Sequence, residues 1–220
     1  MVIRLDDIHG LVRGEAFRHL LAAGVPATGE DLAASIGISA DKMTRVLDEL
    51  NAAGRIRRDE AGRVIGSAGL SVVADRHQID FEGRRFWTWC AYDILGIFGA
   101  LRATGTAASQ SPATAAPITI RFHDGRPEAT GVVLFRPSDS LAASCTSVYE
   151  EWCPNSNFFE DAASARAWSA SHNLDGRVLS LEEASVLASA EWLPVTRPRE
   201  RRSPGDSWAR CKSGLKGKAE

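Results

Sequence analysis

The strongest constraint on this chain is a long apolar and aromatic segment, Phe86–Leu101, that contains one cysteine and one aspartate. Its periodicity predicts a helix buried in the core. A carboxylate buried in such a helix needs either a partner or a function. If the segment is helical, Cys90 and Asp93 lie one turn apart on one face, with their Cβ atoms roughly 5–6 Å apart. An ion pair of Asp93 with Arg84 or Arg85 is the structural alternative.

A second cysteine, Cys153, lies in the aromatic segment Glu151–Phe159, where Pro154 predicts irregular backbone. Loops of this kind commonly carry function. Two distant thiols and one carboxylate suggest either a soft-metal site or a thiol-based catalyst. The competing interpretation of any single cysteine is a small buried hydrophobe.

The composition and the N-terminus predict a cytoplasmic protein with reduced thiols. The first ten residues place acidic side chains where a signal peptide needs an unbroken apolar stretch, and no charge-free apolar run is long enough to span a bilayer. The formal net charge of −2 offers no broad footprint for nucleic acid. No cysteine forms a CxxC pair or a structural zinc spacing. The four cysteines are Cys90, Cys145, Cys153 and Cys211.

Residues 1–75 have the pattern of a winged helix, with three helical stripes followed by two short strands around a glycine-containing turn. Thr28 is the expected N-cap of the second helix, and Ser39 is that of the third. The expected elements are helices at Gly14–Ala23 and Gly29–Ile36, a third helix from Ser39 to Gly54, and strands at Arg55–Arg58 and Arg63–Ile65, the latter continuing through Leu70–Val73.

A winged helix invites a DNA-binding hypothesis, because basic residues lie on the expected third helix and hairpin. These residues are Lys42, Arg45, Arg55, Arg57, Arg58 and Arg63. Carboxylates among them oppose the neutralisation of phosphates. They are Asp41, Asp48, Glu49, Asp59 and Glu60. Winged helices also serve as packing modules, so we expect no nucleic-acid partner.

Residues 76–195 form a second unit in which strands and helices mix. Strands are expected at His77–Phe81, Ile118–His123, Gly131–Arg136, Ser144–Glu151 and Val178–Leu181, and helices at Phe86–Leu101, Asp161–Ser171 and Glu182–Trp192. The segment Thr104–Ala116 is rich in small residues and is expected to be a loop. Residues 196–220 are basic and have few apolar side chains, which predicts a disordered tail.

Both cysteine-bearing segments carry a resemblance to a known family, and the likeness runs in the same order over roughly residues 10–190. The chain resembles the bacterial organomercurial (alkylmercury) lyases in Asp59–Gly66, in the run RRFWTWCAYD from Arg84 to Asp93, in the turn with Cys153 and Asn157-Phe158-Phe159, and in Ala167-Trp168.

The resemblance implies an α+β fold, in which a winged-helix-like N-terminal domain precedes a compact mixed α/β catalytic domain with small antiparallel sheets. It matches Cys90 and Cys153 to the family's catalytic cysteines and Asp93 to its catalytic aspartate. The chain departs from some members at Ser111 and Pro154, where those members have further cysteines. Cys145 has no assignable counterpart, and the tail with Cys211 lies outside the likeness.

These residue types suit protonolysis of a carbon–mercury bond. Thiolate is the soft ligand that mercury(II) prefers, and Asp93 can take a thiol proton and return it to the departing carbon. Hg(II) would remain on Cys90, Cys153 and an Asp93 oxygen. We expect an organomercurial substrate, no organic cofactor, no membrane, and small thiols or a mercuric reductase as acceptors of Hg(II). Alternative hypotheses are a soft-metal-binding protein and a metal-sensing winged-helix regulator on the same scaffold.

Overall fold

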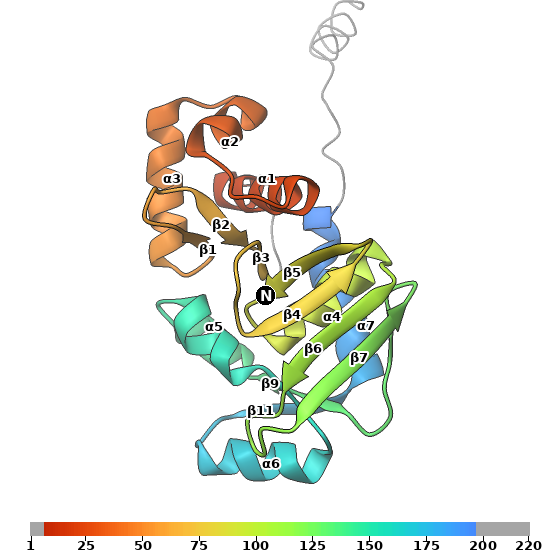
Figure 1. The fold of residues 1–220 in the computed structure, drawn as a ribbon. Coiled ribbons are helices and arrows are strands. Elements are labelled where there is room, and N and C mark those ends of the chain that lie inside the picture. The colour runs from red at the N-terminus through yellow and green to blue at the C-terminus, as the bar shows by residue number, and fades with distance from the viewer. Residues whose placement is uncertain (1–6, 197–220) are drawn as a thin grey trace, which may run out of the picture.

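Three helices and a β-hairpin form the first part of the computed structural model, which describes residues 7–196 (Figure 1). The Thr28 hydroxyl accepts the backbone N–H of Asp31 at 3.0 Å, and the Ser39 hydroxyl accepts that of Lys42 at 3.3 Å. Both predicted N-caps are therefore confirmed. The helices are α1 (Ile8–Ala23), α2 (Gly29–Ile36) and α3 (Ala40–Ala52).

The main sheet has eight antiparallel strands in the order β1-β2-β3-β5-β4-β6-β7-β8. Its strands are β1 (Ile56–Arg58), β2 (Val64–Ser67), β3 (Leu70–Ser71), β4 (His77–Phe81), β5 (Arg84–Thr88), β6 (Gly105–Gln110), β7 (Pro117–His123) and β8 (Arg126–Glu128). Leu70 in β3 pairs with Thr88 in β5. One sheet therefore continues across the domain boundary expected between residues 75 and 76.

A second, three-stranded antiparallel sheet has the order β10-β9-β11. It consists of β9 (Val133–Pro137), β10 (Asn157–Phe159) and β11 (Gly176–Ser180). Between β9 and β10 lie the short helix α5 (Asp139–Ser144), a π-helical turn (Val148–Trp152) and a 3-10 turn (Cys153–Asn155). Helix α6 (Ala162–Ser171), which Asp161 caps, packs on this sheet.

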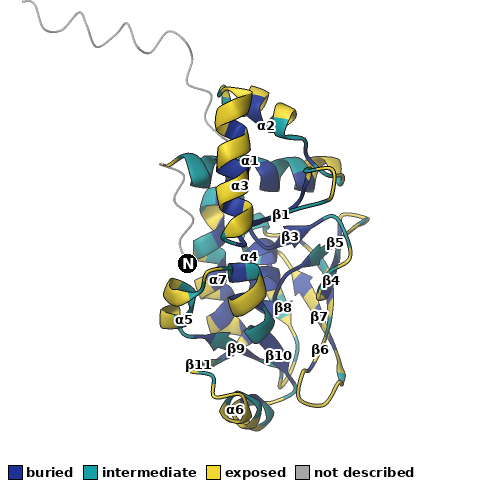
Figure 2. Ribbon diagram, turned by 90° about the vertical axis from the view of Figure 1, so that its left-hand side faces the viewer, coloured by how far each residue is buried: buried dark blue, intermediate teal, exposed yellow. Residues whose placement is uncertain are grey.

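Helices α4 (Ala91–Leu101) and α7 (Leu181–Thr196) pack against each other beside the main sheet (Figure 1). A Cβ atom at Gly96 would lie 2.5 Å from the Trp192 ring, so glycine permits their close approach. The Trp192 indole N–H donates to the Ala68 carbonyl at 2.8 Å and ties α7 to the β2–β3 turn. Figure 2 shows buried residues concentrated where these elements meet, with the outer face of α3 exposed.

The helix expected over Phe86–Leu101 is only partly present, because its first residues belong to β5 and α4 begins at Ala91. Phe86 and Thr88 are buried and Trp87 is less so, which is the alternation of a strand. The change from strand to helix cannot be recognised in the sequence, because both segments are apolar and periodicity does not distinguish a short buried strand from a buried helix.

Three other expectations are wrong. The strand expected to continue from Arg63–Ile65 through Leu70–Val73 is divided by the turn at Ala68 and Gly69 into β2 and β3, which pair with each other antiparallel. The segment Thr104–Ala116 contains the strand β6, because pairing with both β4 and β7 orders small residues that have little strand preference of their own. The segment Ser144–Glu151 is not a strand: the Ser147 side chain accepts the Glu150 N–H at 3.3 Å and starts the π-helical turn.

No helix within residues 7–196 is long and apolar enough to cross a membrane. The tail expected to be disordered lies, from residue 197 onward, outside the described residues, and so does Cys211.

Candidate active site

Cys90 is the N-cap of α4, at the point where the chain turns from β5 into the helix. Its neighbours are held from two sides. The Trp89 N–H donates to the Gly69 carbonyl at 3.1 Å, and the Ala91 N–H donates to the Ser156 carbonyl at 3.0 Å. The thiol is therefore fixed between the β2–β3 turn and the loop that follows Cys153, and it is fully buried.

Asp93 occupies the third position of α4, and its carboxylate accepts the backbone N–H of Cys90 at 2.9 Å. This is the carboxylate half of a capping box. The predicted proximity of Cys90 and Asp93 is thus present, although the cysteine caps the helix instead of lying inside it. Asp93 has no ion pair with Arg84 or Arg85: Arg84 donates to the Leu21 carbonyl, and Arg85 pairs with Asp80.

Gly69 lies directly against Asp93. Its φ is +83°, in the left-handed region, and a Cβ atom there would overlap the Asp93 carboxyl group. The preceding Ala68 also has positive φ, 48°, so the β2–β3 connection is a tight two-residue turn. Sequence reasoning missed this contact, because nothing local relates the turn to Asp93.

Cys153 begins the 3-10 turn after the π-helical turn, and Pro154 follows it. The Ser156 N–H donates to the Cys153 carbonyl at 3.2 Å, and the Asn157 amide donates to the Pro154 carbonyl at 2.7 Å. The irregular backbone expected here is thus a fixed turn, and it buries the thiol.

The side chains of Cys90, Cys153 and Asp93 meet, and their two sulfur atoms and a carboxylate oxygen all lie within 4.8 Å of one another. Both cysteines are free thiols. No other trio of potential metal ligands this close occurs within residues 7–196. Two soft donors and one hard donor in a buried site suit a soft cation such as mercury(II).

Burial shifts the titration of all three groups. It raises the pKa of the Cys90 thiol well above its ordinary value, and hydrogen bonding to Cys153 and the charge of Asp93 add to this. The Cys90 side chain lowers the pKa of Cys153, but burial and Asp93 outweigh it and the net shift is upward. Burial raises the pKa of Asp93 to about 7, although hydrogen bonds from Cys90 oppose the shift. A carboxyl group with such a pKa can both accept and donate a proton near neutral pH.

A cationic and aromatic cluster adjoins the three groups. Arg76 donates to the Trp89 carbonyl at 3.2 Å, and its guanidinium lies 4.4 Å from the centre of the Tyr149 ring. The buried carboxylate of Asp75 pairs with Arg57 at 2.7 Å and accepts the Tyr149 hydroxyl at 3.3 Å. The charge of Asp75 raises the pKa of Asp93, and that of Arg76 lowers it. Arg76 had no recognisable signal in the sequence.

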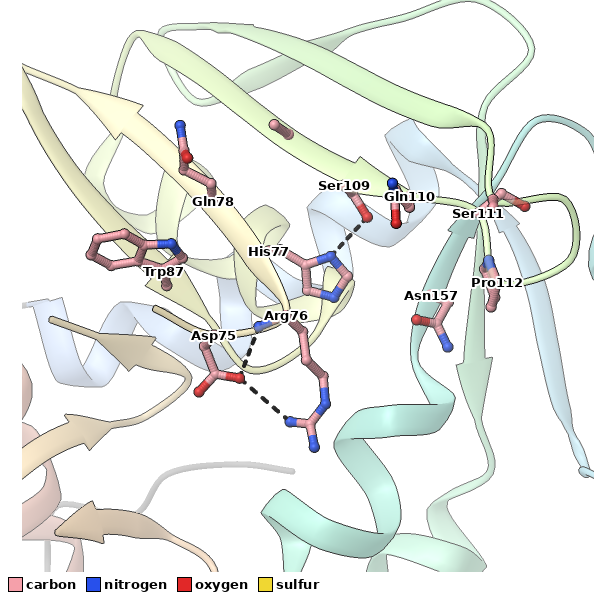
Figure 3. Close-up of a pocket in the computed structure, with 12 residues that line it drawn as sticks. Asp75, Arg76, His77, Gln78, Trp87, Ser109, Gln110, Ser111, Pro112 and Asn157 are labelled. Carbon is pink, nitrogen blue, oxygen red and sulfur yellow. Dashed lines mark hydrogen bonds and ion pairs between the residues drawn. The ribbon is translucent and has the colours of Figure 1, made fainter. Parts of the chain in front are cut away.

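Arg76 also lines a hollow of about 660 Å³ (Figure 3). The hollow is formed by the residues just before β4, by the start of β4, by the end of β5, by β6 with the residues after it, and by the start of β10. Its walls include Asp75, Arg76, His77, Gln78, Trp87, Ala108, Ser109, Gln110, Ser111, Pro112, Ala115 and Asn157. Neither Cys90 nor Cys153 lines it.

Comparison with known proteins shows the family of this chain. A family model described as alkylmercury lyase matches residues 70–193. An alkylmercury lyase of Staphylococcus epidermidis is 30% identical over 76% of each chain. One of Pseudomonas putida is 31% identical over 69% of this chain and 70% of its own. This chain belongs to the alkylmercury lyase family.

The solved structure of a mercury-bound form of MerB2 has the same fold as this member of the alkylmercury lyase family. The two superpose with a TM-score of 0.73, over 85% of this chain and 96% of that one, at 21% identity. The likeness confirms the mixed α/β fold with antiparallel sheets. The winged-helix assignment of residues 1–75 stays a prediction.

Replacing Gly69 by alanine should displace the Asp93 carboxylate. We expect Gly69→Ala to lower the free energy of unfolding by about 1–3 kcal/mol more than Gly83→Ala does, because an added methyl group overpacks the site. Gly83 is a matched control: its φ is +71°, but nothing lies within 4 Å of its Cβ position. Urea unfolding at pH 8 measures both variants. Equal losses would mean that backbone strain alone makes Gly69 necessary.

Proposed function

We propose that this protein is an organomercurial lyase that cleaves carbon–mercury bonds by protonolysis, giving a hydrocarbon and Hg(II). The observation that carries the proposal is the meeting of Cys90, Cys153 and Asp93 within 4.8 Å in a buried site. A site that only binds metal needs the thiols, whereas protonolysis also needs a proton donor beside them. Asp93 is such a donor, because its pKa is raised to about 7.

The first step is capture of the mercurial by a cysteine. An R–Hg⁺ group arrives bound to a small thiolate, and the sulfur of one protein cysteine replaces that ligand on mercury. Asp93 hydrogen bonds to the Cys90 backbone, so it is placed to receive a proton from a neighbouring thiol. The position of Cys90 at the start of α4 supports the developing thiolate, because helix N-termini stabilise negative charge.

The second step breaks the carbon–mercury bond. The other cysteine sulfur binds mercury and raises the electron density on it, and the carbon departs as Asp93 protonates it. The protons balance: two thiols lose one each, one proton goes to the carbon and one to the displaced thiolate. Hydrocarbon leaves, and Hg(II) remains on Cys90 and Cys153 with an Asp93 oxygen nearby. This chemistry uses the three side chains and requires no organic cofactor.

Release of Hg(II) needs competing thiols, because two sulfur ligands hold a soft cation tightly. Small thiols or the cysteines of a mercuric reductase are the proposed acceptors. The reaction also needs reduced cysteines, so we propose that it takes place in the cytoplasm.

Residues 1–75 are proposed to act as a winged-helix-like packing module in front of a catalytic domain formed by residues 76–195. The turn at Gly69 presses on Asp93, and the buried guanidinium of Arg13 lies close enough to Asp93 for the carboxylate to raise the pKa of Arg13. Burial outweighs this and lowers that pKa to about 10, so Arg13 stays charged at neutral pH.

Ion pairing in the hairpin region argues against a DNA-binding regulator. Arg57 pairs with Asp75, Arg58 with Asp48, and Arg63 with Asp59. Guanidinium groups that already neutralise carboxylates contribute little to phosphate binding. The sequence argument against nucleic acid is therefore supported by the contacts.

Cleavage of phenylmercury provides the decisive test. Purified protein with phenylmercury and excess dithiothreitol should release benzene over many turnovers, followed by gas chromatography. Cys90→Ser and Cys153→Ser should each lower the rate by more than roughly 10³-fold, since a hydroxyl is a poor ligand for mercury. Cys145→Ser is the matched control, because Cys145 is a free thiol outside the group. Benzene release by either site variant at the parent rate would remove that cysteine from the mechanism.

Asp93→Asn should separate binding from cleavage. The amide oxygen can still accept the Cys90 N–H, but the side chain cannot move a proton. We expect phenylmercury to bind stoichiometrically, as measured by mass spectrometry, with cleavage slowed by about 10²–10⁴-fold. Turnover at the parent rate would mean that another acid delivers the proton.

The pH dependence of the parent enzyme should report Asp93. Below a pKa of about 7 the carboxyl group is already protonated and cannot accept a thiol proton. The value of kcat/KM for phenylmercury should therefore rise about tenfold per unit of pH up to about 7 and then level off. Rates from pH 5 to 9, in a buffer series of constant ionic strength, measure this. A flat profile from pH 5 to 7 would exclude Asp93 as the initial base.

A further inference from the structure

The hollow beside Arg76 shares walls with both cysteine-bearing segments. Arg76 lines it and also donates to the carbonyl of Trp89, the residue before Cys90. Asn157 lines it from the other side and donates to the carbonyl of Pro154, the residue after Cys153. A molecule in this hollow would therefore contact residues that hydrogen bond to a chain neighbour of each cysteine, without occupying the buried site itself.

The walls of the hollow are polar and carry an available positive charge. The Arg76 side chain is 28% exposed, and within residues 7–196 its hydrogen bond and its ion pair both use Nη1, so Nε and Nη2 remain available. Asp75 is the only carboxylate in the wall, and it pairs with both Arg57 at 2.7 Å and Arg76 at 3.7 Å. Two guanidinium groups therefore share one carboxylate, and a net positive charge remains. The hollow can therefore accept an anion.

His77 adds a buried polar atom that lacks a partner. Its Nδ1 is hydrogen bonded to the Ser109 hydroxyl at 2.7 Å, whereas its buried Nε2 has no partner among the described residues. Figure 3 shows this second ring nitrogen turned away from Ser109, in the space between Arg76 and Asn157. An unpaired buried nitrogen is costly, and a ligand that hydrogen bonds to it removes the cost.

From these walls we propose that the hollow binds a small thiol bearing carboxylate groups, which brings R–Hg⁺ to the cysteines and removes Hg(II) from them. This assignment rests on the proposed lyase function. A volume of about 660 Å³ is sufficient for a peptide-sized ligand. The methyl or phenyl group of the mercurial is a poor occupant, since it cannot hydrogen bond to Nε and Nη2 of Arg76 or to Nε2 of His77.

Thiol exchange from this position is chemically balanced. Each incoming thiol forms one Hg–S bond, breaks one bond from mercury to Cys90 or Cys153, and gives its proton to the departing cysteine. Two exchanges release Hg(SR)₂ and restore both protein thiols.

Binding can be tested without mercury by using S-methylglutathione, which has the carboxylates of glutathione but no free thiol. Calorimetric titration into the full-length reduced protein should give saturable 1:1 binding, with Kd of about 1 mM or tighter. Arg76→Gln and Gln110→Glu should each weaken binding about tenfold, because each removes or opposes positive charge in the hollow. Arg85→Gln, which changes the net charge equally outside the hollow, should stay within about twofold.

Absence of saturable binding, or equal weakening by Arg85→Gln, would overturn the assignment.

The rate of benzene release supplies the second measurement. The ratio of glutathione-supported to dithiothreitol-supported benzene release, with both thiols below saturation, should fall about tenfold in Arg76→Gln. An unchanged ratio would also overturn the assignment. Failure of the parent to release benzene with either thiol would overturn the lyase function instead. The calorimetric titration does not depend on turnover, so it tests thiol binding in the hollow even in that case.

Discussion

The hydrogen bond from the Cys90 N–H to the Asp93 carboxylate determines the geometry of the whole site. It starts α4, because it satisfies a backbone donor that the first turn of a helix leaves without a partner. It also turns the carboxylate back toward the residue that carries the thiol. The same contact that ends β5 and begins the helix therefore places an acid beside a nucleophile, and local folding and chemistry share one interaction.

The second thiol and the wall behind the acid come from distant parts of the chain. The Ser156 carbonyl accepts the N–H that follows Cys90, which brings the Cys153 turn against the start of α4. On the opposite side, the Gly69 carbonyl accepts the Trp89 N–H while Gly69 itself packs against Asp93. Because β3 joins the sheet next to β5, the first 75 residues take part in building the site.

The local part of this architecture was predictable and the long-range part was not. Side chains that cap helices three residues away, such as Thr28 and Ser39, identify themselves by spacing, and α2 was predicted at its observed bounds. The pairing of Cys90 with Asp93 was found in the same way. No spacing relates Cys153 to Cys90, so that pairing came from the family resemblance. Gly69 and Arg76 act through contacts between strands and turns that no local pattern encodes.

Burial of the acid has an energetic cost that bears on mercury binding. A folded-state pKa of about 7, raised from 3.8, means that the folded protein holds a proton that the unfolded chain releases. The contribution of Asp93 to the free energy of unfolding is therefore greatest below about pH 4 and falls by roughly 4 kcal/mol as the pH rises to 7, at about 1.4 kcal/mol per unit. A bound cation reverses this sign, because it favours the charged forms of Asp93, Cys90 and Cys153. A soft cation that binds the three groups therefore relieves the cost of burying their negative charges, which raises its affinity for the site. Competing thiols must bind the cation at least as tightly to remove it.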